Sequence, residues 1–183
     1  DEEGGETSYI YDEDDRLISM TDAEGYSTTF IYDAMDRVVT ITDAKGGVTR
    51  YTYTDHGEGA TKTDAEGYVT SYEYDGNGDL VSKTDPDGYT TEYTYNALDL
   101  VTKINYNDAK EVSYRYNKTG DLISMTDWLG TTTFELDLLH QMTAATDHAG
   151  KRVEYTYDGV GNQTSIAYPD GTTATYDYDL VHN

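Results

Sequence analysis

Carboxylate side chains are the groups in this chain best suited to chemistry. The chain holds 36 acidic residues, and two dense groups lie at 12–15 (DEDD) and at Asp85 and Asp87. Clustered carboxylate oxygens suit a hard cation such as calcium. The sequence has neither the spacing of an EF-hand loop nor the glycine-rich nonapeptide of calcium-binding β-rolls. We therefore expect solvated turns at both places and no cofactor, with calcium as the alternative.

No catalytic constellation is visible in the sequence. So many acidic residues could place two carboxylates at glycosidase spacing by chance, but they recur at fixed offsets, which favours turns. The four histidines are scattered over different offsets and form no metal-ligand pattern: His56, His140, His148 and His182. A Ser-His-Asp arrangement, a phosphate loop and a dinucleotide fingerprint are all missing from the sequence. We expect no enzyme activity and no catalytic residue.

Aromatic residues and two asparagines allow further interpretations. Trp128 occupies a turn position where other repeats hold small or polar residues. With the abundant tyrosines it could form an adhesion or carbohydrate-binding surface, although a packed aromatic stripe is the simpler interpretation. Asn117 and Asn162 begin the triplets NKT and NQT, which match the acceptor pattern for N-glycosylation.

A 21-residue repeat positions all of these residues. Its mark is a pair of aromatic residues separated by one residue, and both rings face the same side of a strand because strand side chains alternate. The first members of the pairs are Tyr9, Phe30, Tyr51, Tyr72, Tyr93, Tyr114, Phe134, Tyr155 and Tyr176. The second members are Tyr11, Tyr32, Tyr53, Tyr74, Tyr95, Tyr116, Leu136, Tyr157 and Tyr178. Every step is 21 residues except one of 20, between Tyr114 and Phe134.

Each repeat predicts two strands and two turns. In the repeat that starts at Tyr72, the aromatic strand ends at Tyr74, and the glycines of GNG at 76–78 let the chain reverse. A second strand follows at 80–84, and DPDG at 85–88 matches a type I turn. The glycines of the second turns are Gly4, Gly25, Gly46, Gly67, Gly88, Gly130, Gly150 and Gly171.

A few repeats depart from this pattern. YNDA at 106–109 lacks the turn glycine, and Gly59 and Gln163 replace the aliphatic residue that otherwise opens the second strand. Leu136 replaces the second tyrosine. We expect these to be the weaker positions of the array.

The recurring aspartates favour hairpins over a solenoid. Equivalent residues would lie roughly 10 Å apart in a sheet of hairpins, but about 4.8 Å apart in a solenoid with one strand per turn. At about 5 Å a column of like charges costs near 1 kcal/mol per neighbour even in water, whereas salt screens it at roughly 10 Å. We predict an all-β fold in which the repeats form consecutive antiparallel β-hairpins in a continuous, curved or spiralling sheet. One array of eight full units and a partial unit would span residues 1–183.

The net charge limits the partners. At −24 the chain lacks the dense lysine and arginine that nucleic acids and anionic membranes reward, so we expect neither partner. No apolar run approaches the roughly 18 residues of a membrane span. The chain has no cysteine, which rules out disulfides and thiolate metal sites.

These repeats resemble the Rhs/YD-repeat family. Its signature is a tyrosine-aspartate pair, present here at 11–12, 32–33, 74–75, 157–158 and 178–179. The family includes bacterial Rhs polymorphic toxins, the C component of insecticidal toxin complexes, wall-associated proteins and teneurins. The resemblance implies a sheet that spirals into a hollow shell, enclosing a toxin or serving as an extracellular scaffold. The family's self-cleaving motif, D-P-x-G-L, is not matched, because DPDG at 85–88 precedes Tyr89.

We therefore expect a structural segment of a large secreted shell or extracellular scaffold, located outside the cell or at its surface. Its partners would be further repeats of the same parent chain, or copies of itself through open β-edges, and an encapsulated cargo. The first alternative is an extracellular fibre extended by end-to-end strand pairing. The second is an adhesion or carbohydrate-binding module.

Overall fold

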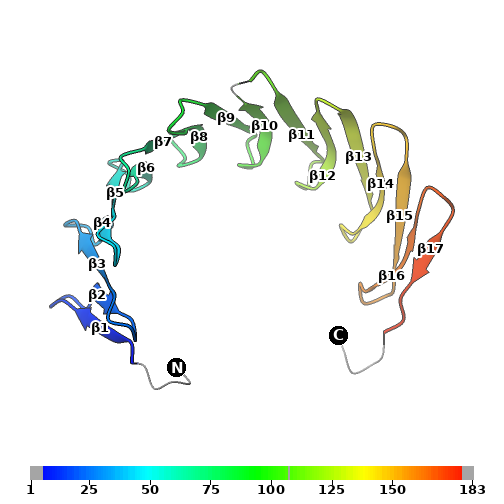
Figure 1. The fold of residues 1–183 in the computed structure, drawn as a ribbon. Helices are drawn as coiled ribbons and strands as arrows, with labels where there is room; N and C mark the ends of the chain where they lie inside the picture. Colours follow the sequence, from blue (N-terminus) through cyan, green and yellow to red (C-terminus); the bar gives the residue numbers. More distant parts are fainter. Residues whose placement is uncertain (1–5, 107, 179–183) are drawn as a thin grey trace. The chain divides into compact units, whose positions relative to one another are not determined.

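The computed structural model describes residues 6–106 and 108–178, and every regular element in them is a β-strand (Figure 1). None of these residues forms a helix that could cross a membrane. Gly4, Asn107, Asp179 and His182 lie outside the described residues. The strands are β1 (Ser8–Tyr11), β2 (Leu17–Thr21), β3 (Ser27–Tyr32), β4 (Val38–Thr42), β5 (Val48–Tyr53), β6 (Gly59–Thr63), β7 (Val69–Tyr74), β8 (Leu80–Thr84), β9 (Thr90–Tyr95), β10 (Val101–Tyr106), β11 (Glu111–Tyr116), β12 (Leu122–Asp127), β13 (Gly130–Leu136), β14 (Met142–Thr146), β15 (Arg152–Tyr157), β16 (Gln163–Ala167) and β17 (Thr173–Thr175).

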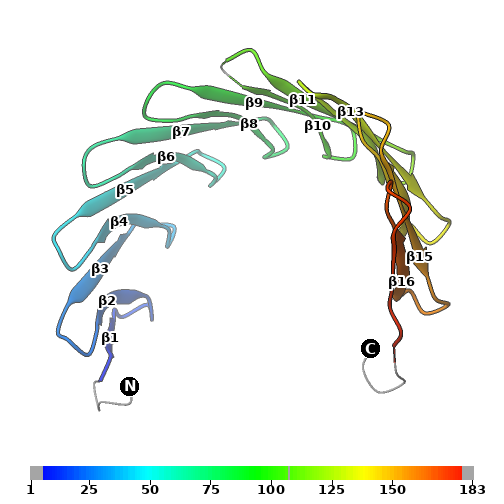
Figure 2. The same cartoon turned by 45° about the vertical axis from the view of Figure 1, so that its right-hand side comes forward.

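The strands form consecutive antiparallel hairpins in one open sheet of 17 strands. Two strands per repeat is the arrangement that the aspartate columns predicted, so the hairpin fold is confirmed. The chain divides into two compact units, Asp1–Thr91 and Glu92–Asn183, with the boundary inside β9. In unit 1, β1 to β8 pair in chain order and lie side by side (Figure 2). In unit 2, β10 to β17 do the same.

A β-bulge recurs at the end of each aromatic strand. Ile31 pairs with Thr40 but Tyr32 pairs with Val38, so β4 carries one extra residue, Val39, at this point. The same shift occurs in the β1–β2, β5–β6 and β7–β8 pairs of unit 1 and in three pairs of unit 2. A bulge adds local twist and re-aims the side chains next to it. It therefore sets the direction of the second aromatic residue in these hairpins.

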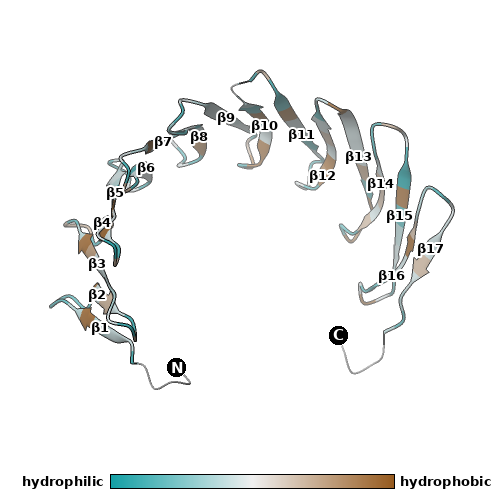
Figure 3. Ribbon diagram, in the orientation of Figure 1, coloured by the Kyte–Doolittle hydropathy of each residue, from teal (hydrophilic) through white to brown (hydrophobic). Residues whose placement is uncertain are grey.

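One face of the sheet is more buried than the other. Along β3 the exposed residues alternate with half-buried ones, and Phe30 and Tyr32 lie on the half-buried side. The sequence left open which face holds the tyrosines, and it is this one. In the described part of the chain only Val112, Ser124 and Ala144 are buried, which fits a single layer of sheet. Apolar residues, in brown, mark the strands in Figure 3, and hydrophilic residues, in teal, mark many of the turns.

The two turns of a repeat share one geometry. At Asp85–Gly88 the Gly88 N–H donates to the Asp85 carbonyl over 3.0 Å, and the Asp85 N–H donates to the Tyr89 carbonyl over 3.0 Å. Gly88 has φ +83°, so a type I turn is followed by a left-handed residue, as in three-residue hairpin loops. At 75–78 the turn begins at Asp75, and Gly78 alone of its two glycines takes positive φ. The expectation that both glycines reverse the chain is thus narrowed to one.

Two turns depart from that geometry or from its usual sequence. Asp127 pairs directly with Gly130 across a two-residue loop of Trp128 and Leu129, so the type I turn expected at DWLG is wrong there. The residue that follows the turn glycine elsewhere is absent, which accounts for the 20-residue step. At the other turn, which lacks glycine, Ala109 adopts the left-handed conformation with φ 64°. Its N–H donates to the Tyr106 carbonyl over 3.1 Å, so the turn keeps its shape at the cost of strain.

Candidate functional site

The second tyrosine of a repeat links its hairpin to the preceding one. Tyr53 ends β5, and its hydroxyl donates over 2.6 Å to the carbonyl of Val38, the residue that opens β4. The acceptor always lies fifteen residues earlier in the chain. We call this set of bonds the tyrosine ladder. Its other members are Tyr32 to Leu17 (2.8 Å), Tyr74 to Gly59 (3.0 Å), Tyr116 to Val101 (2.8 Å), Tyr157 to Met142 (2.7 Å) and Tyr178 to Gln163 (2.9 Å).

The environment of the ladder keeps its hydroxyls protonated. Burial, followed by the charges of Tyr72 and Glu58, raises the pKa of Tyr74 above its usual value. Burial also raises the pKa of Tyr157. A phenol with a raised pKa stays a donor at neutral pH, and each bond satisfies a backbone carbonyl next to a bulge. The ladder therefore joins hairpins through side chains in addition to strand pairing.

Arginines cover two of the ladder rings in unit 1. The guanidinium of Arg37 lies 4.4 Å from the centroid of the Tyr53 ring, and that of Arg16 lies 5.4 Å from the centroid of Tyr32. Arg37 also pairs with the carboxylate of Asp33 at its own turn over 2.7 Å. Each arginine thus connects its turn to the ring of the next hairpin by a cation–π contact.

The aspartates of the tyrosine-aspartate pairs structure the turns. Asp33 Oδ1 accepts the backbone N–H groups of Met35 and Arg37 over 2.8 and 3.0 Å. The hydrogen bond from the Arg37 side chain, followed by these backbone bonds, holds the pKa of Asp33 below its usual value. Asp85 Oδ1 makes the same two bonds, to the N–H groups of Asp87 and Tyr89. A carboxylate in this role replaces water at the turn backbone.

The acidic run at 12–15 is also occupied by local bonds. Asp12 accepts from the Arg16 side chain over 2.7 Å, and Asp14 pairs with Arg16 over 3.2 Å. Within residues 6–106 and 108–178, no group of three or more His, Cys, Asp and Glu side chains is placed to hold a metal ion. Calcium binding at this run stays a prediction that the geometry does not favour.

The aromatic columns are half-buried inside the units and exposed at the ends of the described chain. Phe30, Tyr51, Tyr114 and Phe134 are half-buried. Tyr9, Tyr11, Tyr176 and Tyr178 are exposed. In the sheet Phe30 pairs with Ile41 and Tyr114 with Met125. The columns consequently pack against aliphatic residues of the partner strand.

Trp128 and the two asparagines lie at turns. Trp128 is 59% exposed, and the ammonium of Lys110 lies 5.3 Å from the centroid of its ring. The side-chain amide of Asn117 donates to Asp121 over 2.8 Å, and that of Asn162 donates to Asp158 over 3.0 Å. A glycan on either asparagine would have to break that bond. His56, His140 and His148 are exposed and far apart in the repeat series.

The tyrosine ladder is interrupted at Leu136, which has no hydroxyl to offer the Leu122 carbonyl. A cavity of about 530 Å³ lies here, with the lining residues Asn117, Thr119, Asp121, Ile123, Phe134, Leu136, Asp137, Leu138 and His140. Asp121 Oδ2 accepts from the Asn117 amide (2.8 Å) and the Thr119 hydroxyl (2.7 Å), and lies 2.7 Å from His140 Nδ1. In this order, these contacts lower the pKa of Asp121 to about 2.

Sequence reasoning found the residues of the ladder but not its bonds. The columns were visible as a period, whereas the acceptor of each hydroxyl belongs to the preceding hairpin. The constant offset of fifteen residues between each second tyrosine and the residue that opens a second strand was the available signal. Leu136 stood out as an exception, but nothing in the sequence showed a cavity.

Comparison with known proteins gives the chain a family. The model of the family described as RHS Repeat matches residues 11–48, 74–111 and 137–173. No curated protein matches the chain.

Among solved structures, TcdB2-TccC3 without its hypervariable C-terminal region has a TM-score of 0.82 at 17% identity, covering 98% of this chain and 12% of that one. TcdB2-TccC3-Cdc42 gives 0.78 at 18%, over 93% and 12%. A Tc holotoxin pore from Photorhabdus luminescens gives 0.69 at 22%, over 82% and 9%. These likenesses show a shared fold, and this chain spans about an eighth or less of the length of those chains. Since the family match covers more than half of the 183 residues, the chain belongs to the RHS repeat family.

Proposed function

We propose that this structural RHS-type repeat segment forms part of the wall of a large secreted shell or extracellular scaffold. The tyrosine ladder carries the proposal. A single layer of sheet has little buried core, and most of its stability must come from contacts between neighbouring repeats. The ladder supplies such contacts at nearly every repeat, through six printed hydroxyl bonds. The proposal assigns no catalytic activity to these repeats.

The fold of the similar TccC3-containing structures supports the wall interpretation. A wall continues at its ends, so we expect the outer edges of β1 and β17 to pair with further repeats of a parent chain or with copies of this chain. A shell of this kind would enclose a cargo. The net charge of −24 fits a soluble outer or inner surface and disfavours nucleic acid as that cargo.

Adhesion is the second candidate, and the exposed loop of Trp128 and Leu129 favours it. These side chains are 59% and 64% exposed, and Lys110 covers the indole ring from one side. Exposed aromatic and aliphatic side chains at one loop often mark a contact surface. A module of this kind would bind its ligand as a separate unit, without a closed shell.

Electron microscopy of the native material tests the proposal. Hollow, closed particles are the expected result, and long fibres with a regular axial rise would overturn it in favour of end-to-end strand pairing. Trp128 is the chain's one tryptophan, so its fluorescence reports on the exposed loop directly. A saturable fluorescence change on adding an oligosaccharide, together with monomeric particles, would favour adhesion instead.

A further inference from the structure

The cavity at Leu136 lies where the tyrosine ladder would place a phenol. In the other repeats of unit 2, Tyr116 and Tyr157 reach back to the carbonyl of the residue that opens a second strand. Leu136 takes the same position, because it pairs with Met142 as Tyr116 pairs with Leu122. Its side chain ends short of the ring and hydroxyl of a tyrosine. The ladder therefore lacks one phenol group at this place.

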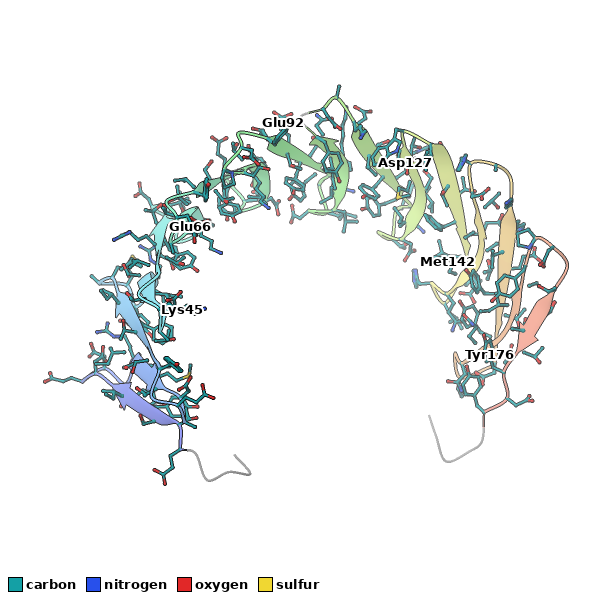
Figure 4. The ribbon with its side chains drawn as sticks, in the orientation of Figure 1. Lys45, Glu66, Glu92, Asp127, Met142 and Tyr176 are labelled. Carbon is teal, nitrogen blue, oxygen red and sulfur yellow. The ribbon has the colours of Figure 1, made fainter. Side chains whose placement is uncertain are left out.

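The walls of the cavity match a neutral aromatic ring. Ile123, Phe134 and Leu136 supply apolar surface on the half-buried face. Asp121 and Asp137 supply carboxylates along another side, and Asp121 is held charged by its bonds to Asn117 and Thr119. Charge of this sign attracts a hydrogen-bond donor and repels an anion. Side chains of this part of unit 2 lie near the labelled Met142 in Figure 4.

The size of the cavity also fits. Its volume of about 530 Å³ lies within the range of about 300–1,000 Å³ that is usual for small-molecule sites. Such sites combine apolar walls with a few polar groups that fix orientation. A substituted phenol is small enough to enter beside Leu136 without moving the turns at 117–120 and 137–140.

We propose that this cavity binds a small uncharged phenol, with its ring between Phe134 and Ile123 and its hydroxyl donating to the carbonyl of Leu122. The ligand completes the ladder from outside the chain. The binding is reversible and breaks no covalent bond. It adds a ligand site to a segment whose other repeats are structural.

The test is a methyl NMR titration of the 183-residue chain with 4-methylphenol, which is the side chain of tyrosine as a free molecule. The expected result is a saturable shift of the Ile123 and Leu138 methyl signals. Toluene, which lacks the hydroxyl, should bind about tenfold more weakly because one hydrogen bond is lost. The anion 4-hydroxybenzoate should bind more weakly than 4-methylphenol. No saturable shift with 4-methylphenol would overturn the proposal.

Variants at the cavity decide where the phenol binds. Leu136→Tyr should fill the site and weaken 4-methylphenol binding about tenfold or more, whereas Leu136→Ala should bind at least as tightly as the wild type. Leu139→Tyr is the matched control, because Leu139 is exposed in the same turn and does not line the cavity. It should leave binding unchanged. Equal binding by Leu136→Tyr and the wild type would place the phenol elsewhere and overturn the proposal. If Leu136→Tyr fails to fold, loss of binding in Leu136→Ala would overturn it.

Discussion

The hairpins joined at Tyr53 and those joined at Leu136 share a backbone but not a contact. At Tyr53 the hydroxyl reaches the Val38 carbonyl over 2.6 Å and Arg37 covers the ring. At Leu136 the same strand pairing and bulge are present, yet no hydroxyl links the hairpins. The difference teaches that the backbone pairing sets the sheet and that the ladder is added by side chains, one repeat at a time.

The turns on the opposite edge teach a related lesson. Asp85–Gly88 uses glycine in the left-handed conformation, and Tyr106–Ala109 makes the same hydrogen bonds with alanine at φ 64°. Asp127–Gly130 is one residue shorter and forms a two-residue loop. The sheet tolerates a strained residue or a shortened turn because each hairpin mainly contacts its neighbours. Local defects therefore stay local.

The largest difference is expected between truncations at the two ladder positions. Tyr53→Ala should lower the free energy of unfolding by about 2–3 kcal/mol, because a half-buried ring, its cation–π contact and its hydrogen bond are all lost. Leu136→Ala should lower it by only about 1 kcal/mol, since the cavity already leaves that side chain loosely packed. Urea unfolding of both variants checks the comparison. Equal losses would mean that the ladder adds nothing to the sheet.

Removing the hydroxyl alone isolates the ladder bond. Tyr53→Phe should cost about 1 kcal/mol, because the Val38 carbonyl loses its donor while the ring stays in place. The same change at the exposed Tyr26 serves as the control and should stay within about 0.5 kcal/mol. Urea unfolding measures both. A Tyr53→Phe variant as stable as the wild type would show that water replaces the hydroxyl at no cost.

The two turns allow a matched exchange. Ala109→Gly should stabilise the chain by about 0.5–1 kcal/mol, because glycine enters the left-handed conformation without strain. Gly88→Ala should destabilise it by about 1 kcal/mol for the converse reason; a side chain at Gly88 meets no atom within 4 Å. Thermal unfolding of the two variants gives both signs. A stabilising Gly88→Ala would contradict the strain argument.

The smallest effect is a pH dependence at the interrupted position. The pKa of Asp121 is lowered to about 2 from an ordinary value of 3.8. The stabilisation from its charged form is therefore complete above about pH 4 and is lost as the pH falls toward 2. Asp121→Asn should narrow the difference in melting temperature between pH 4.5 and pH 2.5 relative to the wild type. An identical pH profile in the two proteins would contradict the assigned pKa.

Much of the fold followed from the sequence, and part of the site did not. The aromatic period and the turn glycines located the hairpins because strands and tight turns are specified by nearby residues. The 20-residue step showed that a residue was missing but not that it was lost from the turn at Trp128. The hydroxyl of Tyr53 and the carbonyl of Val38 meet only because two hairpins lie side by side, and that distance is not written in either segment. The cavity at Leu136 has the same origin, since it depends on side chains of three strands and two turns.

Amide hydrogen exchange of Tyr53→Phe tests most directly the central claim that ladder hydroxyls join neighbouring hairpins. Faster exchange is predicted in β4 (Val38–Thr42) as well as in β5 (Val48–Tyr53), because the lost bond held one hairpin to the other. Exchange in β14 and β15, which belong to unit 2, should stay unchanged. An increase confined to β5, or no increase at all, would contradict the account and leave strand pairing as the sole link between repeats.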